Sequence, residues 1–226
     1  SLRNKGYRVI MMDLFGRGFS DNPDLPQTDF LRANQVIELM DYRGIENAAL
    51  VGLSNGGRII SKIADIDPSK VSSLFYVASA GFFEHTELSD KSVSQEEIDE
   101  FIKGYPGLSE SQKNDFFNPD KFPDWSKKYD ELLTHYGFAR ALISTTKNLV
   151  SLDEAHYKIH SLDIPVFTFW GRHDNVVVYD QFKDRLEKML PNRKEFFIEN
   201  SGHLPHMENQ DDFEKIFFIH LDSALN

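Results

Sequence analysis

One short segment constrains the fold more than any other: Gly52–Gly56, which reads G-L-S-N-G. An almost continuously apolar run, Asn47–Leu53, leads into it, and a helical pattern, Arg58–Ala64, follows it. A strand that passes through one tight turn into a helix is typical of a parallel sheet covered by helices. In such a turn Ser54 takes a strained backbone conformation, and we expect only glycine-sized side chains to fit at positions 52 and 56.

Apolar, β-branched and aromatic runs alternate with helical patterns along much of the chain. The other expected strands are Tyr7–Met12, Val71–Ala80, Pro165–Trp170 and Lys194–Glu199. The other expected helices of this part are Leu31–Tyr42, Tyr179–Met189 and Asp212–Ala224. This alternation predicts an α/β fold with a mostly parallel sheet covered on both faces.

The alternation stops between about residues 82 and 160. This stretch has no good strand pattern, and glycine and proline residues punctuate it. It has helical patterns at Gln95–Lys103, Trp125–Tyr136 and Arg140–Leu149. We therefore predict the first part of an α/β core at 1–81, a helical lid or cap at 82–160 inserted after the third expected strand, and the second part of the core at 161–226.

Composition excludes several classes of function. The net charge is −11, and lysine and arginine form no dense cluster, so we expect no binding to nucleic acid or to anionic membrane surfaces. No apolar run approaches ~18 residues, so we expect no membrane span in this sequence. The absence of cysteine excludes disulfides, Cys-ligated zinc and a cysteine nucleophile. No signal peptide opens the sequence, which favours a cytoplasmic location.

The serine of the tight turn suggests nucleophilic catalysis. A serine hydroxyl needs a base, and the base needs a carboxylate that orients it. In proteins with a G-x-S-x-G turn, the chain order is serine, acid and histidine, each after a strand. Asp174 and His203 follow expected strands in that order. We predict Ser54 as the nucleophile, His203 as the base, Asp174 as the orienting acid and the Asn55 backbone N–H as an oxyanion donor.

Other residues compete for these roles. His206 is an alternative base, but we favour His203 because the Ser-Gly pair before it permits a tight exit from the strand. Glu84 is an alternative acid, and His173 is expected to shape the loop beside Asp174. A metal site built from these histidines lacks the helical i, i+4 histidine pair, so we expect no metal.

The segment Asp13–Ser20 contains half of a dinucleotide-binding fingerprint, because Gly16 and Gly18 follow an expected strand. The third glycine is absent, and Asn22-Pro23 stands where a helix would begin. We therefore interpret the segment as a structural turn and expect no cofactor.

These motifs together resemble the lidded α/β-hydrolase superfamily over essentially the whole chain. The matching pieces are the D-x-x-G-x-G-x-S segment Asp13–Ser20, the elbow Gly52–Gly56, the acid loop Gly171–Asp174, and Gly202-His203 followed by Pro205, Glu208 and Phe213. The resemblance implies a parallel-rich sheet with a helical lid, the triad deduced above and a mostly hydrophobic pocket between lid and core. Members include esterases, lipases, C–C bond hydrolases, epoxide hydrolases and haloalkane dehalogenases. The last two look different, because aspartate replaces serine at the elbow.

The chain departs from the family at its start. Members usually begin with two or three further strands, and an H-G loop after one of them supplies the second oxyanion donor. In the family's strand order, a further strand lies between Tyr7–Met12 and Asn47–Leu53, and without it both would expose unpaired backbone groups. We therefore expect the N-terminal strands and the second donor to be missing here, and a separate N-terminal segment or a second chain to complete the sheet.

Ten of the aromatic residues in the stretch 82–160 favour an apolar acyl or aromatic pocket, although most of them are expected to pack the helices. They are Phe82, Phe83, Phe101, Phe116, Phe117, Phe122, Trp125, Tyr129, Tyr136 and Phe138. The first functional hypothesis is a serine hydrolase that cleaves a carboxylic ester of a small apolar substrate through an acyl-enzyme. The alternatives are a C–C bond hydrolase of ring-fission diketones, and a non-catalytic ligand-binding protein or inactive fragment on the same fold.

Overall fold

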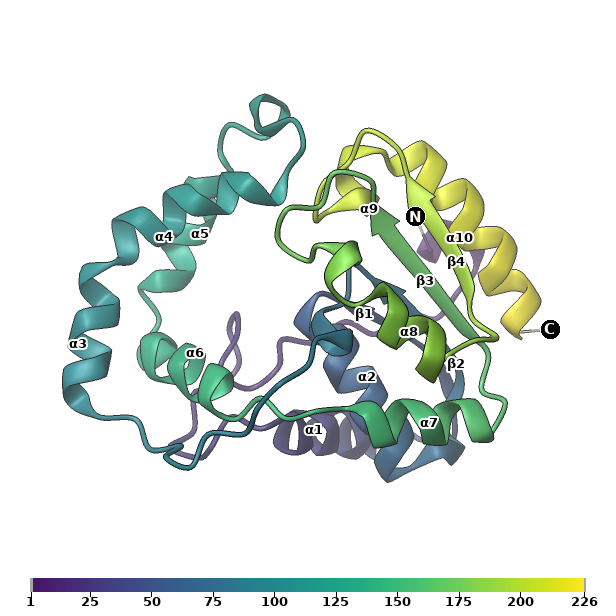
Figure 1. Cartoon of the computed structure of the whole chain (residues 1–226), viewed down its shortest axis with the longest axis horizontal. Helices are drawn as coiled ribbons and strands as arrows, with labels where there is room; N and C mark the ends of the chain where they lie inside the picture. The colour runs from purple at the N-terminus through teal and green to yellow at the C-terminus, as the bar shows by residue number, and fades with distance from the viewer. Residues whose placement is uncertain (1, 226) are drawn as a thin grey trace.

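The computed structural model describes residues 2–225 (Figure 1). Its sheet has four parallel strands in the order β1-β2-β3-β4. They are β1 (Ala48–Leu53), β2 (Val71–Val77), β3 (Val166–Gly171) and β4 (Lys194–Ile198). The register places Leu53 opposite Val77, Val77 opposite Phe169, and Gly171 opposite Ile198. The carboxyl ends of all four strands therefore share one edge, where α/β sheets bind their ligands.

The two central strands are buried on both faces, as their continuous apolar sequences predict. Every residue of β3 is buried, and all of β2 is buried except Ser72. Successive side chains alternate between the faces, so Leu74 and Tyr76 join one hydrophobic cluster while Phe75 and Val77 join the other. The sheet core is thus two separate apolar layers.

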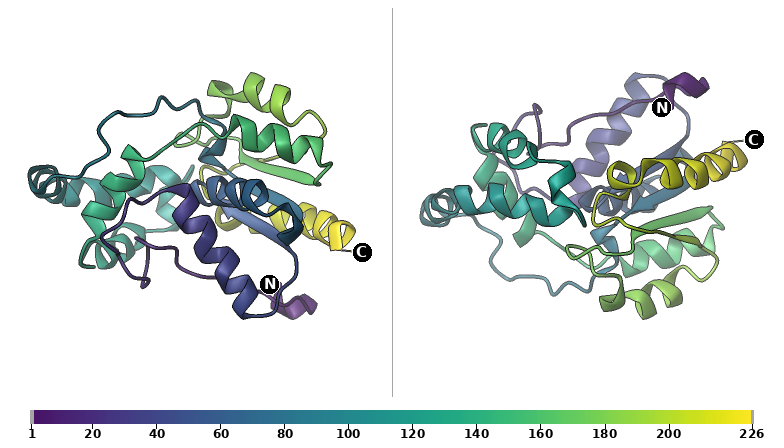
Figure 2. Two further views of the ribbon diagram at one scale, coloured as in Figure 1. Left: turned by 90° about the horizontal axis from the view of Figure 1, so that it is seen from below. Right: turned by 90° about the horizontal axis from the view of Figure 1, so that it is seen from above.

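Helices cover both faces of the sheet (Figure 2). On one face lie α1 (Asp29–Tyr42), α2 (Asn55–Ile66), α7 (Asp153–Ser161) and α8 (Lys183–Met189). The other face is covered by α10 (Gln210–Leu225), which follows the short helix α9 (Pro205–Glu208). Six 3₁₀ segments connect these elements: η1 (Arg3–Lys5), η2 (Pro68–Lys70), η3 (Ala80–Phe82), η4 (Gln112–Asp115), η5 (Pro119–Lys121) and η6 (Tyr179–Gln181). Between residues 2 and 225, no helix combines the length and the apolar character that crossing a membrane requires.

Four helices lie beside the sheet body rather than on it (Figure 1). They are α3 (Gln95–Lys103), α4 (Tyr105–Ser111), α5 (Trp125–Leu133) and α6 (Phe138–Lys147). We call residues 95–147 the outer helical segment. A capping box of Ser94 and Glu97 starts α3. Helix α7 also falls in the stretch 82–160, but it packs on α2. The predicted division at residues 82 and 160, and the role of this stretch as a lid, stay predictions.

The predicted strand Tyr7–Met12 is wrong. Among the described residues this segment joins no ladder, and Met11 is 90% exposed. A strand needs a neighbour for its N–H and C=O groups, and no described segment fills the place beside β1. As a consequence, the helical stretch follows the second strand of this sheet and not the third. The other predicted strands are confirmed, although β2 ends at Val77 rather than Ala80.

Candidate catalytic site

Ser54 lies in a sharp turn between the end of β1 and the start of α2. Its φ of 50° and ψ of −118° are strained for a residue with a side chain. Two backbone hydrogen bonds hold the turn: Ser54 N donates to the Val77 carbonyl at 2.9 Å, and Ala80 N donates to the Ser54 carbonyl at 3.1 Å. The end of β2 thus fixes the position of the serine, as the predicted strand–turn–helix requires.

Glycine is required at two positions of this turn, one of which the sequence analysis missed. A Cβ atom on Gly52 would lie 2.5 Å from the Gly56 carbonyl oxygen, which confirms the predicted close approach. A Cβ on Gly56 itself would meet no atom within 4 Å, so the size limit predicted there is wrong. The limit falls instead on Gly57, whose Cβ would lie 1.9 Å from Ser79 Oγ, because α2 packs tightly on the end of β2.

The predicted acid and base are in contact. His203 Nδ1 lies 2.9 Å from Asp174 Oδ2, and both side chains are less than 8% exposed. The other carboxylate oxygen, Asp174 Oδ1, accepts hydrogen bonds from Val176 N and Val177 N, each at 2.8 Å. Since both oxygens have partners, the carboxylate is fixed, and it holds the proton of His203 on Nδ1.

This contact depends on two loops that pack backbone against backbone. A Cβ on Gly171 would lie 1.8 Å from the Gly202 carbonyl oxygen, so only glycine permits this approach. His173 N also donates to the Ser201 carbonyl at 2.9 Å. The loops after β3 and β4 therefore bring Asp174 and the base together.

Ser54 follows β1, two strands away from β3 along the same edge. Neighbouring strands lie ~4.8 Å apart, so the loop after β3 has about 10 Å to span and the loop after β4 about 14 Å. Across residues 2–225, neither Ser54 Oγ nor His203 Nε2 makes a hydrogen bond to the protein. The hydrogen bond between serine and base stays a prediction. Catalytic hydrogen bonds of this kind are often long before substrate binds.

The competing residues take other positions. His206 is half-buried near His203, and burial followed by the charge of His203 lowers the pKa of His206. Among the described residues Asp174 forms its ion pair with His203 and not with His206. The alternative acid, Glu84, has a side chain that is 79% exposed. His173 stacks on an aromatic ring of the outer helical segment. In the described part of the chain, no three side chains of metal-binding type gather around one point.

The sequence analysis missed an acidic residue beside the base. The carbonyl oxygen of Asp115 accepts a hydrogen bond from His203 N at 2.7 Å. Burial raises the pKa of the Asp115 carboxyl group, and the nearby His203 partly offsets that rise. Because Asp115 belongs to the outer helical segment, its place beside the base depends on tertiary packing that no sequence motif indicates.

Glu208 connects the same segment to the histidine loop. Its carboxylate accepts backbone hydrogen bonds from Phe117 N at 3.0 Å, from Asn118 N at 2.9 Å and from Gly202 N. The sequence analysis noted Glu208 only as part of a family resemblance. The structure shows that it joins the segment 115–118 to the loop that carries the base.

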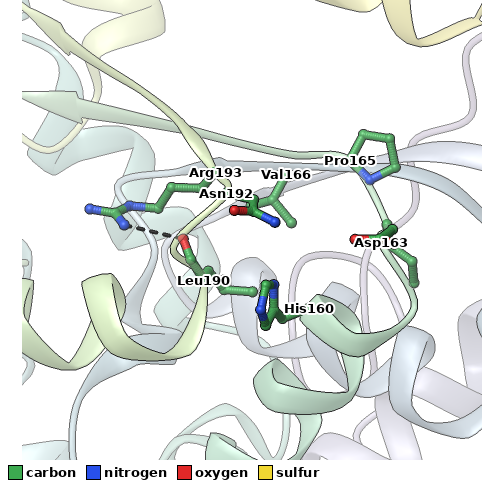
Figure 3. A pocket seen from close by; sticks show the side chains of 8 residues that line it. His160, Asp163, Pro165, Val166, Leu190, Asn192 and Arg193 are labelled. Atoms are coloured by element: carbon green, nitrogen blue, oxygen red, sulfur yellow. Dashed lines mark hydrogen bonds between the residues drawn. The ribbon is translucent and has the colours of Figure 1, made fainter.

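A small cavity lies away from this edge (Figure 3). It encloses about 110 Å³ near the amino end of β3. Its lining residues include His160, Asp163, Pro165, Val166, Leu190 and Arg193. The cavity therefore lies at the opposite end of the strands from the predicted catalytic residues.

Comparisons with known proteins agree with this geometry. The family profile described as alpha/beta hydrolase fold matches residues 1–155 and 147–210. Lipase 3 of Moraxella sp. (strain TA144) is 26% identical over 217 residues, which cover 90% of this chain and 66% of that lipase. The chain thus spans about two thirds of the length of Lipase 3.

Two further proteins are similar. The pimeloyl-[acyl-carrier protein] methyl ester esterase of Aliivibrio fischeri (strain MJ11) is 25% identical over 221 residues, 92% of this chain and 80% of that enzyme. The esterase EaEST of Exiguobacterium antarcticum superposes with a TM-score of 0.78 at 20% identity, covering 98% of this chain and 84% of that one. The profile match spans most of the described sheet and the residues predicted to be catalytic. The chain therefore belongs to the α/β-hydrolase fold family of hydrolytic enzymes.

Proposed function

We propose that the chain cleaves a carboxylic ester of a small apolar substrate through an acyl-enzyme formed on Ser54. One observation carries this proposal: a buried Asp174–His203 pair lies at the sheet edge where the strained turn presents Ser54. A buried carboxylate that accepts a hydrogen bond from one ring nitrogen of a histidine leaves the other ring nitrogen free to act as a base. Two relatives, named as a lipase and a methyl ester esterase, support the choice of an ester bond.

In the first half of the reaction, Ser54 Oγ attacks the ester carbonyl carbon and its proton passes to His203 Nε2. Asp174 stabilises the imidazolium ion that forms, without taking the proton itself. The tetrahedral intermediate then collapses, and His203 returns the proton to the departing alcohol oxygen. In the second half, water attacks the acyl-enzyme by the same proton route and releases the carboxylic acid.

The negative oxygen of the tetrahedral intermediate needs hydrogen-bond donors. Asn55 is the first residue of α2, so its backbone N–H has no partner within the helix. The positive end of the helix dipole adds to the attraction. One such donor contributes on the order of 10²–10³ in rate. We therefore assign the Asn55 N–H to this role.

The aromatic residues near the loops that carry Asp174 and His203 support an apolar substrate. Phe116 stacks on Phe122 with ring centroids 4.2 Å apart, and Trp125 meets Phe116 edge-on at 5.2 Å. The neighbouring Phe117 stacks on His173 at 4.0 Å. We propose that the outer helical segment acts as the lid and that these rings border the acyl group of the substrate.

A fluorophosphonate probe tests the nucleophile. We expect covalent labelling of Ser54, located by mass spectrometry of the tryptic peptide, and no labelling of Ser54→Ala. Turnover of p-nitrophenyl acyl esters, compared with turnover of ring-fission diketones, tests the bond that is cleaved. Faster turnover of the diketones would favour C–C bond hydrolysis. Absence of both labelling and turnover would favour a non-catalytic protein.

A further inference from the structure

Two arginines share one hydroxyl group at the junction of the sheet body and the outer helical segment. Arg17 Nη2 donates to Thr145 Oγ1 at 3.2 Å, and Arg32 Nη2 donates to the same oxygen. Arg32 is 1% exposed and Thr145 is 7% exposed. Arg17 Nη1 also donates to the Gly16 carbonyl at 2.7 Å and Arg32 Nε to the Phe15 carbonyl at 3.4 Å, so all of these acceptors are neutral oxygens.

The nearby carboxylate of Asp29 offsets this charge only in part: it raises the pKa of Arg32, but burial and the charge of Arg17 have larger effects in the opposite direction. Asp29 Oδ2 accepts both Nε and Nη2 of a third arginine, Arg58, at 3.1 and 2.7 Å. Over the described residues, neither Arg17 nor Arg32 forms an ion pair. The buried Nη1 atoms of Arg32 and Arg58 also make no hydrogen bond there. The cluster of three arginines and one aspartate therefore carries an excess positive charge.

A buried charge without a counterion is strongly destabilising. Burial, followed by the charge of Arg17, lowers the pKa of Arg32 to about 10. Arg193 has a buried side chain too, but it has counterions. Its Nη2 lies 3.0 Å from both Glu187 and Glu195. The contrast indicates that Arg17 and Arg32 are suited to a negative group from outside the chain.

Two neighbouring residues, Arg58 and Tyr129, connect the cluster to the predicted catalytic residues. Arg58 lies one helical turn after Ser54 on α2, a rise of about 5.4 Å along the helix. On the opposite side, Tyr129 of α5 interacts electrostatically with both Arg17 and Asp115. The carbonyl of Asp115 in turn accepts a hydrogen bond from the backbone N–H of His203, the predicted base. In both views of Figure 2 the purple loop that precedes α1 in the chain runs toward the teal outer helices.

We propose that Arg17, Arg32 and Thr145 bind a carboxylate group carried by the substrate, so that the preferred substrates are half-esters of dicarboxylic acids. A carboxylate has two oxygens that can accept from two guanidinium groups at once. The substrate is then apolar between its two ends, with the ester bond at Ser54 and the acid group at the arginines. This inference rests on the proposed esterase activity.

The first test compares two substrate series of equal chain length: p-nitrophenyl half-esters of dicarboxylic acids and neutral p-nitrophenyl acyl esters. The measured quantity is the ratio of their kcat/KM values. A hydrogen bond to a charged group is worth about 10–100-fold, so Arg32→Gln and Arg17→Gln should lower the ratio by about that factor. Arg32→Lys should restore part of it, because the charge remains.

Arg193→Gln is the matched control, because it also removes a buried arginine. It should lower the melting temperature and leave the ratio unchanged, since Arg193 is paired with two carboxylates. Thr145→Val provides a further variant in which both arginines remain. An unchanged ratio in Arg17→Gln, Arg32→Gln and Thr145→Val, each with a cooperative melting transition, would overturn the proposal.

The second test does not require turnover. Succinate should raise the melting temperature of Ser54→Ala in a concentration-dependent way and should lose this effect when Arg17→Gln is added. Succinate binding without esterase activity would support the carboxylate site and refute the proposed function. Esterase activity without succinate binding and without a preference for half-esters would refute the site alone. Stronger stabilisation by inorganic phosphate than by succinate would overturn the assignment to a carboxylate.

Discussion

The sheet body and the outer helical segment are stabilised by different interactions. In the sheet body, Phe169 packs against Phe196 and Phe213, each with ring centroids 5.2 Å away, and is fully buried. Within the described residues, the outer helical segment contributes no member to either hydrophobic cluster of the sheet. Helix α3 has no buried residue at all.

Polar contacts connect the outer segment to the sheet body instead. The Glu208 carboxylate accepts hydrogen bonds from the backbone N–H groups of Phe117 and Asn118. The Thr145 hydroxyl accepts hydrogen bonds from the two arginines, Arg17 and Arg32. Apolar burial is large and non-directional, whereas hydrogen bonds are modest and specific in geometry. We therefore expect the sheet body to carry most of the stability and the outer segment to open at a lower free energy than the sheet body.

The largest effect should come from a residue that contributes chemistry but almost no stability. Ser54→Ala removes the nucleophile, and we expect kcat to fall by on the order of 10⁴–10⁶. The free energy of unfolding should change by less than about 0.5 kcal/mol, because Ser54 is in a turn and its side chain makes no hydrogen bond among the described residues. Ester hydrolysis and urea denaturation measure the two quantities. Substantial residual turnover would contradict the serine mechanism.

Matched phenylalanine variants test the difference in stability directly. Phe169→Ala in β3 should destabilise the protein by about 3–5 kcal/mol, because it removes a fully buried ring and leaves a cavity. Phe101→Ala in α3 should cost less than about 1 kcal/mol, because that helix buries no residue and the ring meets only Tyr105 edge-on at 6.0 Å among the aromatic rings described. Urea denaturation of both variants provides the comparison. Equal losses would show that the outer segment is part of the same core.

The predictions from sequence were most accurate for features that short-range patterns determine. The run Gln95–Lys103 was predicted as a helix and is α3, because its capping box and periodicity act locally. The order of Ser54, Asp174 and His203 predicted that they share one sheet edge, because all parallel strands of one sheet end there. The contact between Asp174 and His203 follows from that order.

The failures involve packing between distant segments. Tyr7–Met12 has a strand-like sequence, but strand formation depends on a neighbour that the segment itself does not encode. Gly57 is required by the approach of Ser79, which lies on a different element. The sequence also did not predict that Arg17 and Arg32 both donate to Thr145, because this contact depends on how α1 packs against α6. No pattern within a single helix indicates such contacts.

The sheet body also contains a buried histidine that should make its stability depend on pH. His156 Nε2 lies 3.0 Å from Ser61 Oγ, and burial, followed by the charges of Arg58 and Arg185, lowers the pKa of His156 to about 3. The usual value is about 6.5. Between these values the unfolded chain binds a proton that the folded protein does not bind. The free energy of unfolding should therefore fall by up to about 1.4 kcal/mol per pH unit as the pH decreases through this window.

The variant His156→Gln isolates this contribution. Urea denaturation at several pH values between about 7 and 4 should give a smaller pH slope for the variant than for the unchanged protein. Carboxylates add their own slopes to both proteins, so the difference between the two slopes is the quantity of interest. Equal slopes would show that His156 takes up a proton in the folded state.

The last prediction concerns the connection between the two regions. Glu208→Gln places an amide N–H₂ group among the backbone N–H donors of Phe117, Asn118 and Gly202, so at least one donor loses its acceptor. We expect a loss of about 1–3 kcal/mol in stability and faster proteolysis between residues 115 and 118. Glu199→Gln is the matched control. It disrupts an exposed ion pair with Arg172 and should cost less than about 1 kcal/mol.

This prediction separates two ways in which the outer segment can be held. If the Glu208 contacts position it, Glu208→Gln should increase cleavage at 115–118 and lower kcat, because the Asp115 carbonyl would no longer hold His203 N. Limited proteolysis and ester hydrolysis measure these effects on the same sample. If both variants are cleaved at the same rate as the unchanged protein, apolar contacts such as the stacking of Phe117 on His173 are sufficient, and the two regions differ less than their cores suggest.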